Sequence, residues 1–82
     1  MIASAQVSVY PIRQEHLGPA IATVRAALEA HGLSPEIGPM STHVVGEADV
    51  LFAALREAFA KAAESGEVVM TITLSNACPI PT

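Results

Sequence analysis

The chain has 82 residues, with eight acidic and four basic side chains and a formal net charge of −4. This length predicts one domain with a single core. The few basic residues form no cluster, which argues against a nucleic-acid partner. No apolar run is long enough to predict a membrane span, and no basic segment followed by an apolar stretch opens the chain, so no signal peptide is expected.

Apolar residues make up 51% of the chain, and the mean hydropathy is +0.46. A domain of this size buries only about 60% of the surface that its unfolded chain exposes. The apolar excess therefore predicts surface that other subunits cover; the alternative is an alanine-rich composition that raises the index without such a surface. The single Cys78 cannot form an internal disulfide, which is typical of a cytoplasmic protein.

The first half of the chain predicts a strand, a helix and a second strand. Residues 6–12 alternate between apolar and polar side chains, the period of a half-buried strand, and Pro11 marks its end because proline cannot donate to a ladder. Pro19 suits a first helical position, and Gly32 ends that helix. Residues 33–40 predict an edge strand because they contain two prolines. The expected apolar face of the helix consists of Ala20, Ile21, Val24, Ala27 and Leu28.

The second half repeats this pattern. Residues 42–47 predict a third strand. Asp49 favours the start of a second helix, either as its cap or as an acid near the positive end of the helix dipole, and Gly66 ends that helix. Residues 67–75 predict a fourth strand, and a proline-rich tail follows at 77–82. The expected apolar stripe of the second helix consists of Leu51, Phe52, Leu55, Ala58, Phe59 and Ala62.

The resulting order, β-α-β-β-α-β, predicts a ferredoxin-like α+β fold, a four-stranded antiparallel sheet with both helices on one face. One domain would span residues 1–82, with an ordered core of about 5–76. The first and third strands would be central and the other two would be edges. The helix-free face would carry neutral polar groups, Gln6, Ser8, Tyr10, Thr71 and Thr73.

Neutral hydroxyls on that face suit partial burial, because each can find a hydrogen-bond partner without the cost of desolvating a charge. We therefore expect another subunit or a ligand to cover the helix-free face. The alternative is the ordinary β-propensity of threonine and tyrosine, which would place them on a strand facing solvent.

The residues form no catalytic pattern. His16, His31 and His43 lie in different predicted elements without metal-ligand spacing, and no glycine-rich phosphate loop follows a strand. Cys78 has no flanking base or second cysteine. We therefore expect a protein that is not an enzyme and uses no cofactor or metal. The residues alone predict a small oligomeric binding domain.

Three segments are similar to one known family: residues 7–12 (VSVYPI), 36–42 (EIGPMST) and 69–79 (VMTITLSNACP). Together they resemble the YkoF-like family of thiamine- and hydroxymethylpyrimidine-binding proteins. The resemblance implies a ferredoxin-like fold and a non-catalytic role in binding thiamine or its hydroxymethylpyrimidine precursor, in uptake, salvage or delivery. Some members carry two such repeats in one chain. This chain has one, so pairing between chains, as a dimer or tetramer through sheet faces or edges, would replace the second copy.

An aminopyrimidine ligand needs a few directed hydrogen bonds and flat apolar contact. Hydroxyl and amide side chains would supply the hydrogen bonds. An aromatic ring and an adaptable thioether would supply the apolar contact, and a carboxylate would favour the positive thiazolium of thiamine. The candidate ligand-binding residues are Ser8, Tyr10, Met40, Ser41, Thr42, Glu47 and Asn76.

The predicted fold separates these candidates. Tyr10 and the turn at residues 40–41 lie at one end of the sheet, whereas Glu47 and Asn76 lie at the other. Either subunits share the site or part of the set is structural, and the turn end with Ser8 is preferred. The alternative function is a structural self-assembling module that has no small ligand.

Overall fold

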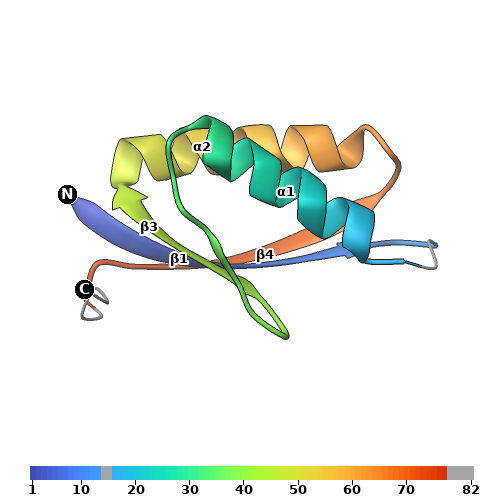
Figure 1. The fold of residues 1–82 in the computed structure, drawn as a ribbon, viewed down its shortest axis with the longest axis horizontal. Coiled ribbons are helices and arrows are strands. Elements are labelled where there is room, and N and C mark those ends of the chain that lie inside the picture. Colours follow the sequence, from blue (N-terminus) through green and yellow to red (C-terminus); the bar gives the residue numbers. More distant parts are fainter. Residues whose placement is uncertain (14–15, 78–82) are drawn as a thin grey trace.

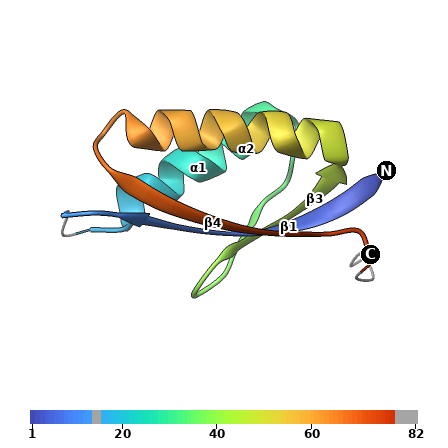
Figure 2. The same cartoon turned by 180° about the vertical axis from the view of Figure 1, so that it is seen from behind.

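The computed structural model describes residues 1–13 and 16–77. Both helices cover one face of a single antiparallel sheet whose strand order is β2-β3-β1-β4 (Figures 1 and 2). The ferredoxin-like prediction is confirmed, including the two central strands. Cys78 and the predicted tail beyond Ala77 lie outside the described residues. The elements are β1 (Ile2–Pro11), α1 (Gly18–Ala30), β2 (Glu36–Ile37), β3 (Thr42–Glu47), α2 (Ala48–Ala63) and β4 (Val68–Ser75).

The core lies between the sheet and the helices. Strand alternation directs Val7 and Val9 toward the helices, where both are buried. Leu28 of α1 and Leu51 of α2 are completely buried in the same core, and each such side chain contributes about 1.5–3 kcal/mol relative to exposure. The two helices also contact each other, and small side chains such as the fully buried Ala58 of α2 take part in the core.

The predicted apolar stripe of α2 is wrong at its two phenylalanines. Phe52 is 59% exposed and Phe59 is 46% exposed, whereas Leu51 and Leu55 of the same stripe are buried. The phenylalanines lie seven residues apart and so share one flank of the helix. That flank lies above β4, where the sheet ends. Helical periodicity predicts which residues belong to the apolar stripe. Whether neighbouring elements bury each of these residues depends on the tertiary fold.

Strand lengths also differ from the prediction. β1 begins at Ile2, four residues before the expected start, because β3 pairs with it as far as Ile2↔Glu47. β2 is confined to Glu36–Ile37 instead of residues 33–40. Pro35 and Pro39 flank this short strand, and neither has an N–H group to extend the ladder.

The start of α2 settles the role expected for Asp49. The N-cap residue is Glu47, which makes no side-chain capping bond, and Asp49 lies in the first turn. The capping prediction is therefore wrong, and the alternative, a favourable charge near the positive end of the helix dipole, fits the position.

Candidate functional site

β1 extends beyond the strand that pairs with it on one side. The β1–β3 ladder ends at Val7↔Thr42, whereas β1 continues to Pro11. The turn between β2 and β3 bends toward the helix-free side of the sheet instead of following β1 (Figure 1). Within this turn Gly38 N–H donates to the carbonyl of Ser41 at 2.8 Å, and a side chain at Gly38 would meet that oxygen at 3.0 Å. The second half of β1 consequently has one free edge.

A crevice of about 100 Å³ lies along this free edge. Apolar groups supply most of its surface, and they come from three parts of the fold: β1, the start of α1, and the β2–β3 turn. These groups include Val9 of β1, Leu17 at the N-cap of α1, Ile21 of α1 and Ile37 of β2. The described residues that line the crevice carry no charged side chain.

Two hydrogen bonds hold the β2–β3 turn against β1. They use part of the hydrogen-bonding capacity of the serine hydroxyls that are predicted to bind the ligand. Ser8 Oγ donates to the carbonyl of Met40 at 3.2 Å, and Gln6 Nε2 donates to Ser41 Oγ at 3.2 Å. A hydroxyl has one donor and two acceptor positions. Ser8 Oγ therefore still has acceptor capacity, and Ser41 Oγ still has its proton to donate. The pair can offer a ligand one acceptor and one donor.

The main chain of Val9 supplies a second acceptor and donor at the crevice. Ala48 N–H donates to the carbonyl of Met1, and Ile12 N–H donates to the carbonyl of Glu67. The register is continuous between these points, so main-chain groups of odd-numbered β1 residues point toward β3 and those of even-numbered residues toward β4. Val9 is the first such position beyond the end of the β1–β3 ladder. Its N–H and C=O groups therefore face the crevice.

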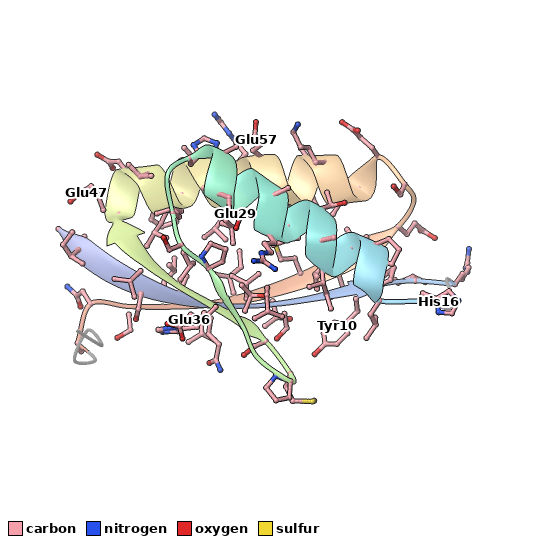
Figure 3. All side chains as sticks on the ribbon, viewed as in Figure 1. Tyr10, His16, Glu29, Glu36, Glu47 and Glu57 are labelled. Atoms are coloured by element: carbon pink, nitrogen blue, oxygen red, sulfur yellow. The ribbon has the colours of Figure 1, made fainter. Side chains whose placement is uncertain are left out.

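The remaining candidates at this end take different positions. Tyr10 is 45% exposed and points to the helix-free side of the sheet (Figure 3), where its ring borders the crevice. Thr42 is only 7% exposed and lies opposite Val7 on the helix side. Met40 lies at the exposed tip of the turn. The structure thus brings five predicted residues, Ser8, Tyr10, Met40, Ser41 and Thr42, to one crevice.

The other two candidates lie at the opposite end of the sheet. Figure 3 shows Glu47 far from Tyr10. Both carboxylate oxygens of Glu47 accept hydrogen bonds from the amino group of Met1 at 3.0 Å, and Asn76 Nδ2 donates to Met1 Sδ at 3.3 Å. Both side chains therefore have local partners in the protomer, and the structure does not bring them to the crevice.

Other polar groups offer little chemistry. His31 Nε2 lies 3.0 Å from Glu57 Oε2 and joins the end of α1 to α2. Within residues 1–13 and 16–77 no three His, Cys, Asp or Glu side chains gather closely enough to hold a metal ion. In the same residues no helix is both long and apolar enough to cross a membrane.

The sequence matches the thiamine-binding protein family over residues 5–76. The chain belongs to this family. The match confirms the resemblance inferred from the three segments. Among curated proteins, none matches the chain at a significant level.

Solved structures share the fold of this thiamine-binding family member. A Streptococcus pneumoniae protein is 27% identical, with 92% of this chain and 86% of that chain covered and a TM-score of 0.83. A hypothetical protein from Methanocaldococcus jannaschii is 18% identical, with coverage of 98% and 84% and a TM-score of 0.85. A Thermotoga maritima protein provisionally assigned to thiamine biosynthesis or salvage is also 18% identical, with coverage of 90% and 82% and a TM-score of 0.79. At 18% identity, the last two show the fold alone.

Proposed function

We propose that this protein binds the aminopyrimidine ring of thiamine, or of its hydroxymethylpyrimidine precursor, in the crevice at the free edge of β1. One observation carries the proposal: in a chain of a thiamine-binding family, a small apolar crevice presents uncharged donors next to uncharged acceptors. Such a lining suits a flat, neutral, nitrogen-rich ring, which needs a few directed hydrogen bonds and apolar contact on its faces.

The volume of the crevice limits what it can enclose. A cavity of about 150 Å³ holds benzene, and sites for larger ligands run from about 300 to 1,000 Å³. The crevice, at about 100 Å³, is smaller than that, so it would seat a single six-membered ring only in part, with one edge of the ring left outside. The thiazolium of thiamine would remain outside it, open to solvent or to a second subunit. This supports a site completed by assembly, in keeping with the homo-oligomer expected from the sequence.

The available hydrogen-bonding groups match the edge of an aminopyrimidine. That edge places an amine donor beside a ring nitrogen acceptor. The N–H of Val9 would donate to the ring nitrogen, and the carbonyl of Val9 would accept from the amine, as two strands do in a ladder. Ser8 and Ser41 offer the same pairing at the mouth of the crevice.

Tyr10 supplies flat contact, and its face suits a nearby positive thiazolium. The net charge of −4 favours a cationic ligand over an anionic one. Glu47 is removed from this role because it lies at the other end of the sheet, paired with the amino group of Met1. The set that we propose for binding is therefore Ser8, Tyr10, Met40, Ser41 and Thr42 with the main chain of Val9.

The proposed role is non-catalytic: uptake, salvage or delivery of the ligand, in the cytoplasm. The crevice lining offers no His, Cys, Asp, Glu or Lys side chain among the described residues, so it holds no pair of groups suited to general acid–base catalysis near neutral pH. Binding without turnover is what such a lining supports. The single cysteine of the chain suits a reducing compartment.

Isothermal titration calorimetry with thiamine and with hydroxymethylpyrimidine tests the proposal. We expect saturable binding of both below millimolar concentration, and much weaker binding of the isolated thiazole alcohol, which lacks the aminopyrimidine edge. Absence of heat and of any spectral change with both pyrimidines at millimolar concentration would defeat the proposal.

The second candidate function is a structural self-assembling module. The exposed phenylalanines of α2 favour it, because apolar surface of this kind usually meets another protein. A stable oligomer that binds neither pyrimidine would support this candidate over the first.

A further inference from the structure

Gln6 and Ser8 lie two residues apart on β1, so their side chains share the helix-free face of the sheet. Both reach the β2–β3 turn. Gln6 Nε2 donates to Ser41 Oγ at 3.2 Å, and Ser8 Oγ donates to the carbonyl of Met40 at the same distance. Ser8 and Ser41 line the crevice, whereas Gln6 does not. Gln6 therefore lies one hydrogen bond behind the proposed ligand.

The two partners differ in what sets the direction of each hydrogen bond. The carbonyl of Met40 can only accept, so the hydroxyl proton of Ser8 is used there whatever side chain residue 40 carries. The partner of Ser41 is a side chain. An amide N–H of Gln6 occupies one lone pair of Ser41 Oγ and leaves the hydroxyl proton for another acceptor. A side chain at position 6 that only accepts would reverse this direction.

The backbone at Ser41 has supports that do not involve Gln6. Gly38 N–H donates to the carbonyl of Ser41 at 2.8 Å within the turn. The β2–β3 ladder holds the base of the turn through the pair Ile37↔Thr42. The direction of the Ser41 hydroxyl is what remains for Gln6 to set.

We propose that Gln6 is a positioning residue that sets the ligand preference of the crevice by keeping the Ser41 hydroxyl as a donor. This inference rests on the proposed function. When the amine edge of the ring meets the main chain of Val9, the second ring nitrogen, away from the amine, lies at the mouth of the crevice. That nitrogen is an acceptor, and the proton of Ser41 is the donor that it needs. Gln6 thus makes the mouth select a ring nitrogen over a C–H group.

A purely structural role for Gln6 predicts a different pattern. Were the amide only an anchor of the turn, its loss would weaken the binding of every ligand alike. Setting the direction of a hydroxyl changes one ligand relative to another, because an unpaired donor or two facing lone pairs penalise only the ligand that meets them. The ratio of two affinities therefore separates the two roles.

Calorimetry with two ligands and two matched variants of the full chain tests the inference. The ligands are hydroxymethylpyrimidine and its analogue with C–H in place of the ring nitrogen away from the amine, both at a pH at which each ring is neutral. Gln6→Glu offers only acceptors at position 6, and Gln6→Lys offers only donors. Gln6 is exposed in the protomer, so both variants should fold, as circular dichroism would verify.

We expect the wild type and Gln6→Lys to favour hydroxymethylpyrimidine over the analogue about tenfold, the effect of one unpaired hydrogen-bonding group. The carboxylate of Gln6→Glu accepts the proton of Ser41, so in this variant the preference should disappear or reverse. In a Ser41→Ala background both variants should show one ratio, because the hydroxyl through which residue 6 acts is absent.

The same preference in Gln6→Glu and Gln6→Lys, with the wild type still binding hydroxymethylpyrimidine, would overturn the inference and leave the proposed function standing. A parallel loss of both ligands in the two variants would also overturn it, because that is the pattern of a structural anchor. A wild type that binds neither ligand would defeat the proposed function and this inference with it.

Discussion

The sheet ends differently at its two edges, the one on the β3 side of β1 and the one formed by β4. On the β3 side, a bent turn leaves only a few residues of β1 unpaired, and the start of α1 encloses them in a small crevice. On the other side, β4 presents an unbroken edge beside a long apolar groove. A short, enclosed edge with a few donors and acceptors suits a small ring, whereas a long, open edge suits another strand. The two edges of one sheet thus suit two different kinds of partner.

The largest effect on the crevice is expected from Ile37→Trp. Ile37 lines the crevice and is 44% exposed, so a larger side chain there should fill the space with little effect on folding. We expect at least a 100-fold loss of pyrimidine affinity by calorimetry and an unchanged oligomer. Ile2→Trp is the control, because Ile2 is similarly exposed (48%) and lies opposite Glu47 at the other end of the sheet. Equal affinity of the Ile37 variant and the wild type would place the ligand elsewhere.

A smaller but more specific effect is expected from the ligand. An analogue of thiamine with a carbonyl in place of the amine reverses the donor and acceptor at the edge that Val9 would read. An unpaired buried donor or acceptor costs about 1–3 kcal/mol, so we expect a loss of about 10- to 100-fold in competition titrations. If amine and carbonyl forms bind equally, the main-chain groups of Val9 do not read the ring.

Tyr10 should contribute less than the crevice itself. Its ring borders the crevice from an exposed position, and aromatic contacts of this kind contribute about 0.5–1.5 kcal/mol. We expect Tyr10→Ala to weaken thiamine binding up to about tenfold and Tyr10→Phe to weaken it less than threefold. A stronger effect of Tyr10→Phe than of Tyr10→Ala would mean that the hydroxyl, and not the ring, makes the contact.

The smallest effects are expected at the far end of the sheet. Glu47 and Asn76 bond to Met1, not to groups of the crevice. Glu47→Gln and Asn76→Ala should change affinity less than twofold. The exposed ion pair of Glu47 contributes at most about 1 kcal/mol, so unfolding in urea should also change little. A tenfold loss of affinity in either variant would indicate a ligand bound near α2, or one shared between subunits.

Much of the fold follows from local patterns. Alternation in β1 and β4, helical spacing in α1 and α2, and Gly32 with its positive φ of 80° are local properties that the sequence carries directly. The length of β2 was overestimated because the effect of its flanking prolines depends on pairing with β3. The exposure of Phe52 depended on its position above an edge strand, which periodicity does not reveal.

The side chains of the candidate site could be predicted from the sequence, but its main-chain groups could not. The turn at residues 38–42 and the side chains of Ser8 and Tyr10 stand out by composition, and the structure brings them to one crevice. The separation of Glu47 and Asn76 from that end followed from the strand order. The role proposed for Val9 was missed because its main chain is available only where the β3 ladder stops. The available signal was the late start of the third predicted strand, at Thr42, which leaves the second half of the first strand without a partner on that side.

Amide chemical-shift mapping during titration with thiamine tests the central claim most directly. If the ring binds at the free edge of β1, the largest changes will fall on Val9, Tyr10 and the turn around Ser41, and the amides of Glu47 and Asn76 will stay nearly unchanged. Changes centred on Glu47 and Asn76, or none at saturating thiamine, would contradict the account.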